Sequence, residues 1–142
     1  MLDAAAMRFD ANSPVQVLDP ADCRALLQHE TLGRVAFANG PFPMVLPINY
    51  VYVDDLIVFR TDVGLKLENV PMRAVAFEID GRNHTNAWSV VALGHAREVT
   101  TALGPRYDAL RKADIAVVAP GRKVHWIAIE VQEISGRTFP IS

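Results

Sequence analysis

The chain has 142 residues, with 14 lysines and arginines against 16 aspartates and glutamates and a formal net charge of −2 at pH 7. Because it lacks a basic surplus, it does not have the electrostatic character of a nucleic-acid-binding protein, and any anion site must be local. The length suits a single domain that buries a core without disulfides, and the single cysteine, Cys23, cannot form an internal one.

No segment predicts export or a membrane span. Asp3 precedes any basic residue at the N-terminus, which is unlike a signal peptide, and no apolar run approaches the ~20 residues that cross a bilayer. We therefore expect a cytoplasmic protein without a membrane partner. The hydrophobic fraction of 51% exceeds the need of a small monomer, so we expect a homodimer that buries the surplus.

The chain begins with an expected tail, a short strand and a helix. Residues 1–13 have no sustained periodicity, which is typical of a flexible tail, and the single domain is expected over residues 14–142. A short strand is expected near Val17. Asp19-Pro20 joins a capping side chain to a proline suited to the first helical position, which predicts a helix over residues 20–29.

Two strands joined by a tight turn are expected next. Residues 33–38 alternate between large and small apolar side chains, and Asn39-Gly40 is a strong hairpin turn. The return strand is expected to run unbroken over residues 44–53 and, because both of its faces are apolar, to be buried on both sides. Pro47 cannot donate to a sheet hydrogen bond, which indicates an edge, a bulge or a place where a ligand meets the backbone.

The stretch over residues 58–70 changes from a strand into a short helix. Thr61 and Asp62 lie where a helix cap is expected, and Lys66 follows in the helix. A helix N-terminus offers free N–H groups and a positive dipole end, and a nearby lysine adds a mobile cation. The stretch therefore predicts a phosphate-binding turn. The alternative is a capped turn with a solvated lysine.

The second half of the chain predicts further strands and one more helix. We expect strands over residues 73–79, 88–99 and 123–134, a polar loop over 80–87, a helix over about 104–113, a loop over 114–123 and a turn over 135–139. Gly94 in mid-strand indicates a bend or bulge. Six or more strands in hairpin order predict a mainly β fold, a barrel with inserted helices.

Several kinds of site are not indicated by the sequence. It has neither a Cys-x-x-Cys pair nor a His-Glu-x-x-His motif, and its four histidines are scattered, so no metal site is expected. Glycine-rich nucleotide motifs and a nucleophile elbow are also missing. No catalytic residue stands out.

Five motifs occur in a fixed order: Gly33-Arg34-Val35-Ala36-Phe37, Pro43-x-Val45-x-Pro47-x-Asn49-Tyr50, Phe59-Arg60-Thr61-x-x-Gly64-x-Lys66-Leu67, Val75-Ala76-Phe77-Glu78-Ile79-Asp80 and Trp88-Ser89-Val90-Val91-x-x-Gly94-x-Ala96. Over about residues 15–137 the chain resembles the pyridoxamine 5′-phosphate oxidase-like family of FMN-binding split barrels, in particular its short actinobacterial-type branch. The resemblance implies an antiparallel six-stranded split barrel and a homodimer that binds FMN at the subunit interface.

The resemblance also implies which residues bind the cofactor. They are Pro47, Ile48, Asn49, Tyr50, Arg60, Thr61, Lys66, Leu67, Trp88 and Ser89. The first four correspond to the strand whose backbone meets the pyrimidine edge of the flavin, the next four to the phosphate-binding turn, and the last two to a strand lining the ring system. Trp88 is alternatively a core residue, and Ala87 stands where a glycine is usual in the family.

The implied activity is that of an FMN-dependent oxidoreductase acting on an unidentified small-molecule substrate. Two alternatives stay open. A deazaflavin-dependent reductase on the same fold would need more basic residues around its longer phosphodiester tail than Arg60, Lys66 and Arg73 provide, so FMN is favoured. A non-catalytic carrier of flavin or haem is the other, with His84 or His125 as the axial ligand of the haem.

Overall fold

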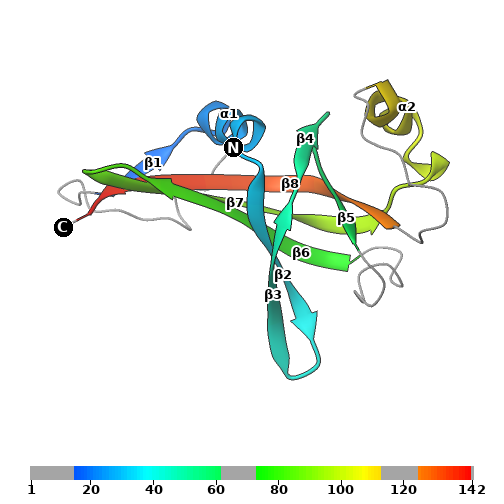
Figure 1. Cartoon of the computed structure of the whole chain (residues 1–142), viewed down its shortest axis with the longest axis horizontal. Helices are drawn as coiled ribbons and strands as arrows, with labels where there is room; N and C mark the ends of the chain where they lie inside the picture. The colour runs from blue at the N-terminus through cyan, green and yellow to red at the C-terminus, as the bar shows by residue number, and fades with distance from the viewer. Residues whose placement is uncertain (1–14, 62–72, 113–124, 142) are drawn as a thin grey trace.

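The computed structural model of the chain describes residues 15–61, 73–112 and 125–141 (Figure 1). Within these ranges, eight strands form one antiparallel sheet in the order β3-β2-β6-β7-β8-β5-β4, and β1 pairs with β8. The elements are β1 (Gln16–Leu18), α1 (Pro20–His29), β2 (Leu32–Asn39), β3 (Phe42–Asn49), β4 (Val51–Val53), β5 (Leu56–Thr61), β6 (Arg73–Arg82), β7 (Asn86–Glu98), the 3-10 helix η2 (Thr101–Leu103), α2 (Pro105–Lys112) and β8 (His125–Pro140). The predicted antiparallel, mainly β fold is confirmed.

The sheet is curled because its two end strands are neighbours in sequence. β3 and β4 lie at opposite ends of the strand order, yet only Tyr50 separates them in the chain. From β4 the strands β3 and β5 run apart, and the β2–β3 hairpin projects away from the body of the sheet (Figure 1). The predicted unbroken strand over residues 44–53 is wrong, because the Tyr50 N–H donates to the carbonyl oxygen of Thr31 at 2.9 Å.

The main core lies between one face of the sheet and α1. Its largest fully buried members include Phe59, Phe77 and Ile127, and α1 adds Cys23 and Leu27. The predicted helix cap is confirmed, since the Asp19 Oδ1 accepts the Asp22 N–H at 2.9 Å. Burial raises the pKa of the Cys23 thiol to about 11, which keeps it protonated at neutral pH.

The opposite side of the sheet, which we call the outer face, is covered at one end by η2 and α2. Leu103 and Leu110 pack there on a second cluster with Leu56, Val58 and Ala128. Arg106 fixes α2 in place, because its Nη2 donates to the Asp54 carbonyl oxygen at 3.1 Å and its Nη1 lies 3.4 Å from Glu130 Oε2.

Two predicted irregular segments are strands in the structure. The predicted loop over residues 80–87 shrinks to a turn over 83–85, in which the Asn83 Oδ1 accepts the N–H groups of Thr85 and Asn86 at 2.9 and 2.8 Å. The predicted turn over residues 135–139 belongs to β8. Gly136 allows β8 to pass close to α1, because a Cβ atom there would lie 2.6 Å from the Cys23 Sγ.

Three further predictions can be compared with the structure. The bulge predicted at Gly94 is confirmed by the register shift at Leu93/Gly94. β3 was expected to be buried on both sides, but it is an end strand on which Phe42 is 76% and Val45 58% exposed. This position agrees with the edge indicated by Pro47. The expected tail, the short helix around Lys66 and the loop over residues 114–123 lie outside the described residues.

Candidate functional site

The last positions of β3 alternate between the two faces of the sheet. Ile48 packs against the main core, whereas Pro47 and Asn49 are exposed on the outer face. Because β3 is an end strand, half of its backbone N–H and C=O groups point away from β2. This edge can therefore offer main-chain hydrogen bonds to a ligand.

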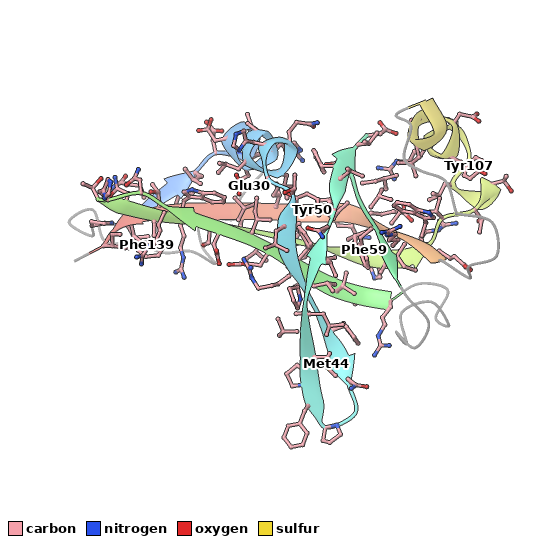
Figure 2. The ribbon with its side chains drawn as sticks, viewed as in Figure 1. Glu30, Met44, Tyr50, Phe59, Tyr107 and Phe139 are labelled. Atoms are coloured by element: carbon pink, nitrogen blue, oxygen red, sulfur yellow. The ribbon has the colours of Figure 1, made fainter. Side chains whose placement is uncertain are left out.

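Tyr50, the next residue, directs its side chain into the core. Its hydroxyl donates to the carbonyl oxygen of Leu27 at 2.8 Å, and its ring meets that of Phe77 edge-on, with centroids 4.8 Å apart. Burial raises the pKa of the Tyr50 hydroxyl, and the Glu30 carboxylate adds to the rise, so the hydroxyl stays a donor. Tyr50 lies below α1 in Figure 2. Any contact between Tyr50 and a ligand on the outer face would involve its backbone.

The predicted phosphate-binding turn begins where β5 ends. Arg60 is exposed there, and its side chain has no ion pair or hydrogen bond with any residue that the structure describes. The backbone of Thr61 pairs with His125 in β8. The side chain of Thr61, together with Lys66 and Leu67, lies outside the described part of the chain. Arg73 is held on β2, where its Nη2 donates to the Ala38 carbonyl oxygen and its Cζ lies 4.9 Å from the centroid of the Phe37 ring. These contacts orient the guanidinium but do not neutralise its charge.

Trp88 and Ser89, at the start of β7, point to opposite faces. Trp88 packs against the main core and lies over Gly81, where an added Cβ would be 2.6 Å from its ring. Ser89 is half-buried on the outer face, paired with Asp80 on β6 and Arg137 on β8. Trp88 therefore lies in the core, as its alternative interpretation predicted. Of these two residues, only Ser89 lies on the same face of the sheet as Pro47 and Asn49.

A charged cluster lies on the outer face between Pro47 on β3 and Ser89 on β7, and the sequence did not reveal it. The Arg34 Nη2 is 2.5 Å from Glu78 Oε1 and 3.0 Å from Asp80 Oδ2. Desolvation raises the pKa of Glu78, as does its hydrogen bond with Asp80, while Arg34 opposes the rise. The sequence contained one indication of this cluster, because Glu78 and Asp80 are two residues apart and residues two apart on a strand share a face. The sequence could not show that Arg34 pairs with both carboxylates.

Small apolar residues continue the outer face beside this cluster. One row across four strands consists of Val45, Ala36, Ala76 and Leu93, and Leu93 is 41% exposed. In the next row Pro47 pairs with Arg34, Arg34 with Glu78 and Glu78 with Val91. No described element covers this part of the sheet, since η2 and α2 pack over β4, β5 and β8.

The two histidines that were candidate haem ligands lie at different places. The backbone of His125 pairs with Thr61 at the end of β5. His84 is exposed in the β6–β7 turn, at the opposite end of β6 from Arg73 and so about 30 Å along the strand. The His95 Nδ1 is buried without a hydrogen-bond partner among the described residues. The described ranges contain no group of histidine, cysteine or acidic residues placed to hold a metal ion. They also contain no helix with the length and apolar character required to cross a membrane.

Comparisons with known proteins agree with this architecture. Residues 19–138 match the family described as pyridoxamine 5′-phosphate oxidase. Rv0080 of Mycobacterium tuberculosis, an uncharacterised protein, is 34% identical over 93 residues, and the match covers 58% of this chain and 60% of that protein, so less than two thirds of that relative is matched. A FAD-binding protein from Mycobacterium smegmatis is 31% identical with a TM-score of 0.71, covering 88% of this chain and 98% of that one. A protein of unknown function from Corynebacterium diphtheriae is 29% identical with a TM-score of 0.71, covering 89% and 99%.

Proposed function

The chain belongs to the pyridoxamine 5′-phosphate oxidase family, and we propose that it binds a flavin and acts as a flavin-dependent oxidoreductase. The observation that carries the proposal is the similarity to the FAD-binding protein of M. smegmatis over nearly its whole length. A bound flavin supplies hydride or electron transfer, while the protein orients it and tunes its electronic properties through hydrogen bonds and nearby charges.

The described residues fit such a cofactor at three places. The free edge of β3 beside Pro47 and Asn49 can donate to and accept from the polar edge of the ring system. Arg60 is a cation without a partner among the described residues, next to the predicted phosphate-binding turn. Ser89 and the Arg34–Glu78–Asp80 cluster lie on the same face as Pro47 and Asn49. These polar groups can orient the ring system and a small-molecule substrate beside it.

FMN is the form that we propose, because the sequence indicates one phosphate-binding turn with few basic residues. FAD is the second candidate, and the FAD-binding relative at 31% identity favours it. A deazaflavin has less support, because Arg60, Lys66 and Arg73 are few cations for its longer phosphodiester tail. A haem carrier has less support, since His84 lies at the far end of β6 and only the backbone of His125, which pairs with Thr61, is described.

The flavin proposal is tested on the purified protein. We expect flavin absorption bands that disappear from the protein fraction on denaturation, and released FMN that chromatography separates from FAD and deazaflavin. A Soret band instead would indicate haem. Protein that is colourless and binds neither FMN nor FAD on titration would contradict the proposal.

We also propose that the protein is a cytoplasmic homodimer, with the outer face as its interface. The row from Val45 to Leu93 offers a surface of small apolar side chains, and the Arg34–Glu78–Asp80 cluster borders it. Such an uncovered apolar surface is typical of an interaction site. A flavin bound near Asn49 would then lie between two subunits.

Replacing Leu93 with arginine is expected to split the dimer, because each interface would have to desolvate two additional charged side chains. Sedimentation velocity should show mainly monomer and weaker flavin binding. Ala25→Arg is the matched control, since Ala25 is exposed on α1, over the other face of the sheet, and this variant should stay dimeric. A Leu93→Arg protein that remains a dimer with unchanged flavin affinity would exclude the outer face as the interface.

A further inference from the structure

We infer that Tyr50 is a positioning residue for the flavin site, an inference that rests on the proposed function. Tyr50 follows directly on Asn49, yet only 4% of Tyr50 is exposed, and its ring packs in the main core. Its side chain therefore acts on the site only through the backbone to which it is attached.

The hydroxyl and the backbone N–H of Tyr50 both form hydrogen bonds with the last turn of α1 or the residues just after it. Its hydroxyl donates to the Leu27 carbonyl oxygen at 2.8 Å, and its backbone N–H donates to the Thr31 carbonyl oxygen at 2.9 Å. Leu27 carries one of the last four carbonyl groups of α1, which lack partners within a helix. The Tyr50 hydroxyl thus caps the helix and holds the chain at the junction of β3 and β4.

This junction has no strand partner to fix it otherwise. The pairing of β2 with β3 ends at Asn49, and the pairing of β4 with β5 begins at Val51. The path of the chain between the two strands is therefore fixed by the packing of the Tyr50 ring and by the two hydrogen bonds of Tyr50. Small displacements of a binding backbone weaken its hydrogen bonds to a ligand, so we expect the Tyr50 hydroxyl to set both the affinity for flavin and the potential of the bound flavin.

Two tyrosine-to-phenylalanine variants test this inference. Tyr50→Phe leaves the buried carbonyl of Leu27 without its donor and is expected to raise the Kd for FMN about tenfold, with a measurable shift in the midpoint potential of bound FMN. Tyr52→Phe is the matched control. It removes an equivalent hydroxyl that donates to Asp55 Oδ1 at the β4–β5 turn, and it should change neither quantity. Both variants are measured well below their unfolding temperatures, so that lost stability does not affect the comparison.

The outcomes separate this inference from the proposed function. Wild-type protein that binds no flavin would overturn both. Wild-type protein that binds FMN, with the same Kd and potential as Tyr50→Phe, would overturn only the role of Tyr50. If Tyr50→Phe does not fold, amide hydrogen exchange in the wild type decides. Slower exchange of the Tyr50 N–H on adding FMN supports the inference, and unchanged exchange refutes it.

Discussion

Replacing Lys66 with alanine is expected to weaken FMN binding roughly 10- to 100-fold, because hydrogen bonds to charged groups contribute about 1.5–3 kcal/mol. Lys66 follows the end of β5 in the predicted phosphate-binding turn, where a lysine is the mobile cation that a phosphate dianion requires. Arg60 lies just before the turn and is exposed. We therefore expect the residual affinity of Lys66→Ala to fall steeply with added salt.

The control for this variant removes a cation elsewhere. Arg82 is exposed at the opposite end of β6 from Arg73, about 30 Å along the strand. Arg82→Ala should bind FMN as the wild type does, measured by quenching of flavin fluorescence. If Lys66→Ala and Arg82→Ala bind equally well, the phosphate is held by other residues and the predicted turn is misplaced.

Replacing Gly94 with alanine is expected to cause the largest loss of stability of any substitution considered. A Cβ atom at Gly94 would lie 2.0 Å from the Glu130 carbonyl oxygen and 2.9 Å from its carbon. Those atoms belong to the backbone of β8 at the β7–β8 bulge, so they cannot move away as the end of a side chain can. We expect the free energy of unfolding to fall by about 3 kcal/mol or more.

Gly40→Ala is the matched control for this effect. Gly40 has a φ of +63°, so an alanine there is strained, but an added Cβ would meet no atom within 4 Å. The expected loss is about 1 kcal/mol, measured by urea unfolding of both variants. Equal losses would show that β8 yields to the extra methyl group and that close packing at the bulge does not require glycine.

Local patterns were sufficient to predict much of this fold. The Asp19-Pro20 helix start and the Gly94 bulge each depend on the conformational preference of one or two residues. The hairpin after β2 was also predicted, but its turn residues are Gly40 and Pro41, because Asn39 pairs with Phe42 at the end of the two strands. The break at Tyr50 could not be predicted in this way, because it depends on hydrogen bonds from Tyr50 to Thr31 and to Leu27 in α1, about 20 residues earlier in the chain. The continuation of β8 through Gly136 could not be predicted in this way either, because it depends on the close approach of β8 to Cys23.

The sequence predicted which segments contribute to the candidate site, but not how their side chains pair with one another. The family motifs identified the ends of β3 and β5 and the start of β7, and the alternation of a strand separates the outward Asn49 from the inward Tyr50. The Arg34–Glu78–Asp80 cluster needed the knowledge that β2 pairs with β6. That pairing joins residues more than 40 positions apart, which no local pattern reveals.

We propose that the turn after β5 holds the phosphate of a flavin whose ring system lies on the outer face, beside Asn49. A structure of the protein in complex with FMN tests it most directly. We expect the phosphate within hydrogen-bonding distance of Lys66 and Thr61, and the ring edge against the backbone of residues 47–49 between two subunits. A phosphate bound elsewhere, or a ring system on the side of the sheet that α1 covers, would contradict it.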